Sequence, residues 1–250
     1  MDLYEAIATR ISCRAYDGRP VEPEKVAVLQ EEVSRINAES GLHIQLYGPR
    51  EDGFVIEMNQ DMFAGDIPMY AAVVGLSTLD AMEKAGYYGE RLVLLATALG
   101  LGTCWVRSTF NRDTARAELA EDEDLLDVIP IGYAPAEMPE VQQKIRANIR
   151  ARDKKLETLY QGPVALGEAP EWIRIAIRDV QLGPSAVNRQ PIAFTQESAD
   201  APVRAIIADK GRLVSYVDLG IAKLHFELSA AAHGMPGAWE WGEGGAFVLA

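Results

Sequence analysis

The chain has 250 residues, of which 48% are hydrophobic, and a formal net charge of −13 at neutral pH. This composition is typical of a folded globular protein and excludes an intrinsically disordered chain. No apolar run reaches the roughly 20 residues that a membrane span requires, so we expect no membrane partner. The acidic balance argues against a nucleic-acid partner, because neutralising phosphates requires a basic surface.

The amino-terminal residues predict a cytoplasmic protein. Asp2 and Glu5 stand where a secretory signal would carry positive charge and an apolar core. Two cysteines, Cys13 and Cys104, are far apart in the sequence and lie in helix-like or apolar surroundings. In a reducing compartment both are expected to be buried free thiols.

The first group of candidate binding residues follows a short helical pattern near the amino terminus. Arg10, Ser12 and Arg14 bring two guanidinium groups and a hydroxyl within five residues. Arginine suits phosphate because its planar fork donates two parallel hydrogen bonds and stays charged. The alternative is a solvated helix end, where arginines interact favourably with the helix dipole.

The first half of the chain then predicts a strand, a long helix and a second strand. The apolar segments 69–76 and 125–134 flank a helix that ends at Gly100. The sequence Gly100-Leu-Gly102 is not a dinucleotide-binding motif, because it closes a helix and does not open one. The acidic run 121–124 is expected to be a solvated turn, and we assign no metal ligand.

The second half opens with a polar loop. A basic helical stretch, 141–163, serves as the connector, and the helical pattern 171–182 is followed by Gly183 and Pro184, which force a loop. Ser185, Asn188 and Gln190 then lie on a constrained backbone and suit the edge of a heterocycle or a sugar alcohol. The alternative is a surface loop whose polar side chains satisfy their own backbone.

The chain also contains an internal repeat. A shift of 134 residues superposes 86–105 on 220–239 with six identities: Gly86 on Gly220, Leu94 on Leu228, Ala96 on Ala230, Ala98 on Ala232, Gly100 on Gly234 and Trp105 on Trp239. Two unrelated alanine-rich helices are the alternative. Apolar segments 203–217 and 244–250 flank the second copy, so the repeat predicts a mixed α+β fold with helices against a sheet. We place the two related halves at 1–160 and 161–250.

These motifs together resemble the nitroreductase family of flavoproteins. The resemblance covers nearly the whole chain and lies in RISCRAYDGRPV (10–21), ALGLGTCW (98–105), IPIGYAPAE (129–137) and PSAVNRQP (184–191). It implies a nitroreductase-like α+β sandwich, in which helices flank a mainly antiparallel sheet, with FMN as the cofactor. In that family the arginine–serine segment binds the FMN phosphate, while the PSxxNxQP loop of the other subunit contacts the ribityl chain and the ring.

Each half of this chain retains only one of these two segments. Residues 37–48 stand where the first half should carry the loop motif, and nothing like RxSxR precedes the loop of the second half. The chain therefore resembles the tandem subfamily, in which the two halves form an internal pseudo-dimer. That arrangement implies one FMN per chain, in a monomer or a homodimer.

The resemblance also assigns roles to individual residues. Arg10, Ser12 and Arg14 are the expected phosphate ligands, and Arg152 is a further one, with Arg150 and Lys154 as alternatives. Pro184, Ser185, Asn188 and Gln190 are expected to line the ribityl chain and the ring. The backbone near Ser108 is expected close to flavin N5, with Arg107 narrowing or charging the pocket.

The implied reaction is ping-pong hydride transfer. NADH or NADPH would reduce the flavin, which would then reduce a small-molecule acceptor such as a nitroaromatic or a quinone. No side-chain acid or base is required, so no catalytic residue is assigned. The alternatives are another reaction on the same fold, dehalogenation or flavin destruction, and a non-catalytic scaffold that binds free flavin or nothing.

Overall fold

The structure is a computed structural model that describes residues 1–48, 62–209 and 212–250. It divides into two compact units. The first unit comprises Met1–Asp2, Thr9–Ser77 and Arg91–Asn148, and the second comprises Leu3–Ala8, Thr78–Glu90 and Ile149–Ala250. No helix in these described ranges is long and apolar enough to cross a lipid bilayer.

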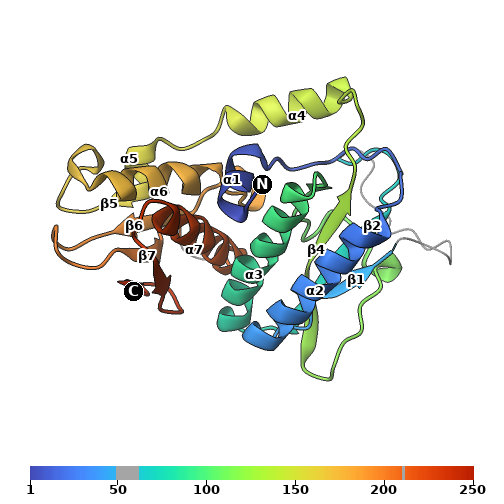
Figure 1. The fold of residues 1–250 in the computed structure, drawn as a ribbon, viewed down its shortest axis with the longest axis horizontal. Coiled ribbons are helices and arrows are strands. Elements are labelled where there is room, and N and C mark those ends of the chain that lie inside the picture. The colour runs from blue at the N-terminus through green and yellow to red at the C-terminus, as the bar shows by residue number, and fades with distance from the viewer. Residues whose placement is uncertain (49–61, 210–211) are drawn as a thin grey trace. The chain divides into compact units, whose positions relative to one another are not determined.

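The first unit is built on a four-stranded antiparallel sheet in the order β1-β2-β4-β3. The strands are β1 (Gln45–Tyr47), β2 (Met69–Leu76), β3 (Gly102–Thr103) and β4 (Glu123–Gly132). The apolar segments β2 and β4 are buried along almost their whole length, as their sequences predict. Helix α2 (Pro23–Ser40) buries one apolar face and ends at Gly41, whose left-handed conformation suits glycine. Helix α4 (Glu140–Arg150) follows β4 (Figure 1).

The second unit repeats this plan. Its helices are α5 (Leu156–Leu159), α6 (Glu171–Leu182) and α7 (Val214–Ala232), and its strands are β5 (Tyr160–Gln161), β6 (Ile192–Thr195), β7 (Arg204–Ile207), β8 (Gly237–Trp239) and β9 (Phe247–Leu249). Figure 1 shows α6 beside α7. An antiparallel bridge from Arg204 to Ala246 joins β7 to the β8–β9 pair. The ladder β6-β7-β9-β8 therefore corresponds to β1-β2-β4-β3, and the predicted α+β fold with a repeated layout is confirmed.

The compact units do not coincide with the predicted halves. By sequence, residues 3–8, 78–90 and 149–160 belong to the half 1–160, yet they pack with the second unit. They include most of α1 (Leu3–Thr9) and the first part of α3 (Leu79–Ala98). Strand β5 shows the consequence, because it pairs in parallel with β6 of the second unit.

The core of the second unit is a cluster of aromatic rings. Phe226 of α7 stacks on Phe194 of β6 with ring centroids 4.9 Å apart, and Trp239 lies 5.2 Å from Phe226 and 5.1 Å from Phe247. All four are almost completely buried. Edge-to-face and stacked contacts of this kind add to the free energy gained from apolar burial. The cluster therefore fixes α7 against the strands of its unit.

Two glycines that the repeat relates allow α3 and α7 to cross at backbone contact. A Cβ atom on Gly86 would lie 2.0 Å from the carbonyl oxygen of Val217, and one on Gly220 would lie 1.9 Å from that of Glu83. Neither distance is possible for a real side chain. The backbones of α3 and α7 therefore contact each other at these two glycines.

Buried charges lie next to this crossing. Lys223 of α7 donates to Glu83 of α3 at 2.5 Å, and both side chains are fully buried. Its other two protons go to the carbonyl oxygens of Glu240 and Gly242, at 2.8 and 3.0 Å. Burial lowers the pKa of Lys223, while its contact with Glu83 opposes that shift. Every N–H of the Lys223 ammonium group has an acceptor. Loss of one partner would therefore leave part of this buried positive charge uncompensated in an apolar core.

His225, two residues further along α7, is also held on both sides. One ring nitrogen lies 3.0 Å from the Glu90 carboxylate and the other 3.1 Å from the carbonyl oxygen of Asp179. His225 is fully buried and joins three segments of the second unit.

We predict that Gly86→Ala and Gly220→Ala each destabilise the protein by about 2–3 kcal/mol or more, because the added methyl group collides with backbone that cannot retreat. Urea denaturation followed by circular dichroism measures the effect. Gly167→Ala is the matched control, since a Cβ there meets nothing within 4 Å. Equal stability of the Gly86 and Gly167 variants would contradict the crossing geometry.

The stability of the second unit should also depend on Glu227. Burial raises the pKa of this carboxyl group, and a hydrogen bond from Tyr87 opposes the rise. The folded state then holds its proton to a higher pH than the unfolded state, so this contribution falls as pH increases above about 4.5, the ordinary value. Glu227→Gln should abolish that part of the pH dependence of the melting temperature. Glu197→Gln, at an exposed position, should leave the profile unchanged.

Candidate functional site

The arginine–serine segment lies in extended backbone, not in a helix. Helix α1 ends at Thr9, with no basic residue in its last turn. Ser12 then forms a parallel bridge with Thr103 of β3, and the Cys13 amide donates to the Thr103 carbonyl at 2.7 Å. The segment thus extends the sheet of the first unit beyond β3. Arg10 directly follows the end of α1, whereas Ser12 and Arg14 lie in the extended segment.

This extended backbone explains the spacing of the motif. Side chains of a strand point alternately to opposite faces. Cys13 and Ala15 are buried, whereas Ser12 and Arg14 are partly exposed. Ser12 and Arg14 therefore share one face of the segment, while the Cys13 and Ala15 side chains are buried.

Arg10 and Arg14 both influence the pKa of the Cys104 thiol. Burial raises the pKa of the Cys104 thiol, and the charges of Arg14 and Arg10 oppose that rise, with a smaller contribution from the Ser12 side chain. Both arginines and the serine therefore lie close to the same sulfur atom. Burial raises the pKa of Cys13 to about 11. Both cysteines are buried and free, as the sequence predicts.

A pocket opens between this segment and α4, with a volume of about 390 Å³ including its mouth. Its floor carries Ser12 and Arg14, and α4 contributes Gln142 and Arg146. The remaining lining residues are mostly apolar: Ile11, Cys13, Ala15, Ala134, Pro135 and Met138. The pocket thus combines two cations with a hydroxyl and an amide.

Arg107 and Ser108, in the segment after β3, have different surroundings. One guanidinium nitrogen of Arg107 lies 3.1 Å from the Asp127 carboxylate and 3.2 Å from the carbonyl oxygen of Leu126. Arg107 is therefore compensated by a buried carboxylate and brings little net charge. Ser108 is exposed, and its position near flavin N5 stays a prediction.

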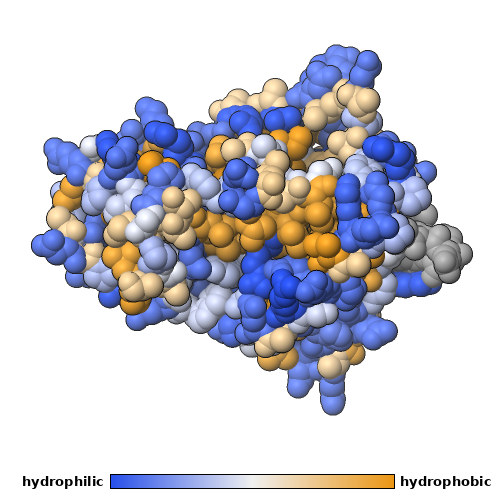
Figure 2. Space-filling model, viewed as in Figure 1, coloured by the Kyte–Doolittle hydropathy of each residue, from blue (hydrophilic) through white to orange (hydrophobic). Residues whose placement is uncertain are grey.

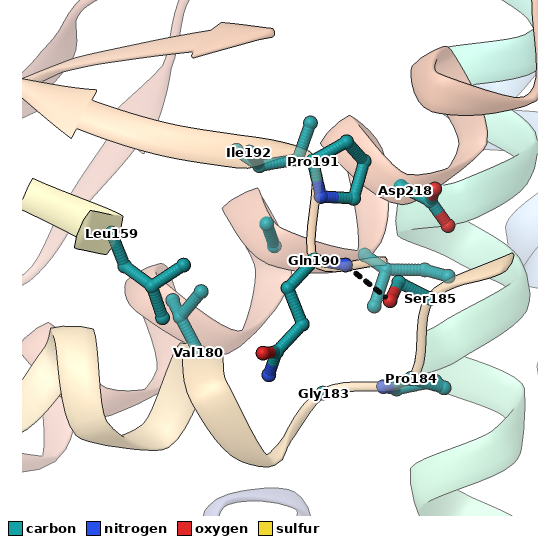
Figure 3. A pocket seen from close by; sticks show the side chains of 11 residues that line it. Leu159, Val180, Gly183, Pro184, Ser185, Gln190, Pro191, Ile192 and Asp218 are labelled. Atoms are coloured by element: carbon teal, nitrogen blue, oxygen red, sulfur yellow. Dashed lines mark hydrogen bonds between the residues drawn. The ribbon is translucent and has the colours of Figure 1, made fainter. Parts of the chain in front are cut away.

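The loop of the second unit has an uncommon backbone. Val187, Asn188 and Gln190 have φ angles of 48°, 54° and 46°, in the left-handed region that favours glycine. For a β-branched residue such as Val187 this is a rare conformation. The Gln190 amide donates to the Ser185 hydroxyl at 2.9 Å (Figure 3), and the Ala186 amide donates to the Asp218 carboxylate at 3.0 Å. These bonds close the loop on itself and anchor it to α7.

Asn188 and Gln190 tie the loop to the segment that follows α4. The Asn188 side-chain nitrogen donates to the carbonyl oxygen of Ile149 and to the Asp153 carboxylate, both at 2.8 Å. The Gln190 side-chain oxygen accepts from the Lys154 amide at 2.6 Å. Both side chains therefore position the loop, and Asn188 has no amide proton left for a ligand. Arg152 lies in the turn between these contacts.

A second pocket, of about 300 Å³, lies beneath this loop (Figure 3). Its polar lining comes from Ser185, Gln190 and Asp218, and the rest is mostly apolar: Leu159, Val180, Pro184, Pro191, Ile192, Ile221 and Ala222. Ser185 and Asp218 are already engaged by backbone amides of the loop. These residues support the loop from below, and no cationic side chain is among those that line the pocket.

The predicted site residues fall into two groups. The first unit holds Arg10, Ser12, Arg14 and Ser108, and the second holds Arg152, Pro184, Ser185, Asn188 and Gln190. The structure brings Ser12 and Arg14 to one pocket, and it brings Ser185, Asn188 and Gln190 into one hydrogen-bonded loop beside residues 149–154. That both groups bind a single cofactor stays a prediction.

The sequence interpretation missed Gln142, Arg146 and Asp218. Met138, Gln142 and Arg146 are spaced by four residues and share one face of α4. That spacing was the signal that could have identified them. Asp218 gave no such signal, because its function is to hold a loop distant in sequence.

The family model described as Putative TM nitroreductase matches residues 2–230. The chain belongs to this family. A putative nitroreductase from Thermotoga maritima MSB8 is similar in structure, with 22% identity and a TM-score of 0.60 over 100% of this chain and 93% of that one. This likeness shows that the two proteins share a fold. No curated protein sequence matches the chain.

Shorter nitroreductases match part of the chain. An FMN-dependent nitroreductase from Clostridium difficile R20291 has 19% identity and a TM-score of 0.42, covering 53% of this chain and 88% of that one. A nitroreductase with bound FMN from Bacteroides fragilis NCTC 9343 has 17% identity and a TM-score of 0.41, covering 56% and 93%.

We predict that Asn188→Ala destabilises the second unit by about 1–2 kcal/mol, because it removes a donor shared by two acceptors. It also places alanine in a left-handed conformation. Asn188→Gly removes the same donor without that strain, so it should cost up to about 1 kcal/mol less than alanine. Thermal unfolding of the two variants separates the contributions. If alanine is tolerated as well as asparagine, the loop is not held as described.

Proposed function

We propose that the chain is an FMN-dependent oxidoreductase that accepts a hydride from NADH or NADPH and reduces a small nitroaromatic or quinone-like acceptor. The observation that carries the proposal is that Ser12 and Arg14 line one pocket of the first unit, with Arg10 at the start of the same segment. The family membership gives this arrangement its expected ligand, the phosphate of FMN.

The phosphate fits the charges of the first unit. The whole chain has 37 acidic and 24 basic residues, so most cations have carboxylate partners at hand. Within the described ranges, however, no carboxylate pairs with Arg14, which is only partly exposed. Holding a guanidinium away from water without a counter-ion costs free energy. A phosphate monoester would supply that counter-ion and accept from the Ser12 hydroxyl as well.

The loop of the second unit would bind the other end of the same FMN. Its backbone is held without a ligand, because Ser185 bonds within the loop while Asn188 and Gln190 bond to residues 149–154. A rigid loop loses little conformational entropy on binding. We therefore propose that Pro184 and the backbone of 185–190 contact the ribityl chain and the ring, with one FMN per chain.

In this proposal the bound flavin supplies the hydride chemistry. The residues of the chain bind and orient it, and none is required as an acid or a base. Arg107 would not attract an anionic substrate strongly, since Asp127 compensates its charge.

Flavin stoichiometry tests this proposal directly. The purified protein should be yellow and should release one FMN per chain on denaturation. NADH or NADPH should bleach the flavin band under nitrogen, and a quinone or nitroaromatic should restore it. A colourless protein that binds no added FMN would overturn the proposal. A flavin that neither nucleotide reduces would overturn the assigned reaction and favour the binding scaffold.

Arg10→Ala and Arg14→Ala should each weaken FMN binding by about 1.5–3 kcal/mol, which is roughly 10- to 150-fold in Kd, because each removes a charged hydrogen bond to phosphate. Titration of FMN fluorescence measures the loss. Arg35→Ala is the control, since this arginine lies on the exposed surface of α2 beside Glu31. Unchanged FMN affinity in both test variants would contradict the phosphate assignment.

A further inference from the structure

Helix α4 contacts the first unit through a polar side chain. Gln142 is its one buried residue, and the side-chain nitrogen donates to the carbonyl oxygen of Met62 at 3.0 Å. Val141, by contrast, is 60% exposed. Figure 2 shows both hydrophilic and weakly hydrophobic residues over α4. The helix packs the half-buried Ile145 inward, and Gln142 adds a buried hydrogen bond to this contact.

That glutamine sets the position of Arg146. The two residues are one turn apart on the same face, and both line the pocket whose floor carries Ser12 and Arg14. Across the ranges that the structure describes, neither Arg14 nor Arg146 pairs with a carboxylate. Lys144, on another face of α4, pairs with Glu140 at 2.6 Å. Lys144 is therefore neutralised within the helix, whereas Arg146, which is exposed at the pocket, has no such compensation.

We propose that Arg146 is a phosphate ligand, which completes with Arg14 and Ser12 a site for a phosphate monoester. This inference rests on the proposed function, in which the monoester is the phosphate of FMN. Gln142 is a positioning residue that holds α4 so that Arg146 faces Arg14. Arg152, the cation that the family resemblance suggests, belongs to the second unit and lies beside the contacts of Asn188.

The assignment has a specific consequence for ligand choice. Riboflavin carries the same ring and ribityl chain as FMN and lacks the phosphate. Removing Arg146 should therefore affect FMN and leave riboflavin unchanged. The ratio of the two dissociation constants isolates the phosphate contribution from everything that the ring contributes.

The experiment measures Kd for FMN and for riboflavin by fluorescence quenching in the apoprotein. Arg146→Ala should raise Kd for FMN roughly 10-fold or more, with riboflavin affinity unchanged and Arg146→Lys restoring part of the loss. Gln142→Ala should reduce FMN binding less than Arg146→Ala. Lys144→Ala is the matched control on the same helix and should keep both affinities.

Three other results have distinct meanings. Wild-type FMN affinity in Arg146→Ala, with Arg14→Ala still weakened, would overturn the inference and leave the proposed function intact. A selective loss in Arg152→Ala in place of Arg146→Ala would overturn it in the same way. A folded wild-type protein that binds neither flavin would overturn the proposed function itself.

Discussion

The close crossing of α3 and α7 at Gly86 and Gly220 is the constraint on which the second unit depends. With the two backbones in contact, Glu83 reaches Lys223, and no larger residue at either glycine would allow it. A buried ion pair contributes little net stability, because desolvation offsets the attraction. It does penalise any other register of the two helices. The glycines thus supply proximity, and the charges make one alignment the preferred one.

The two parts of the candidate site are held in place by different interactions. In the first unit, extended backbone delivers Ser12 and Arg14 to one face, and the free energy of burying Cys13 and Ala15 keeps them there. In the second unit, polar side chains hold a left-handed loop whose conformation is costly without them. One part therefore presents charge on a regular scaffold, and the other presents a fixed backbone shape.

The sequence predicts the repeat, the strands β2 and β4 and the arginine–serine motif, because each has a local pattern of spacing or hydrophobicity. It does not reveal that the side chains of Asn188 and Gln190 form hydrogen bonds with residues 149–154, because those contacts join segments more than thirty residues apart. Strand β5 has two residues, too few for any periodicity. Arg146 carries no motif of its own, since only its spacing from Met138 and Gln142 relates it to the pocket.

The path of the chain between the two units limits how the protein can be divided. Residues 3–8, 78–90 and 149–160 complete the second unit although the first repeat encodes them. A break near residue 160 would remove β5 from the edge of β6 and leave α7 without the glycine that it crosses. Cleavage there would therefore separate all three segments from the core that they complete.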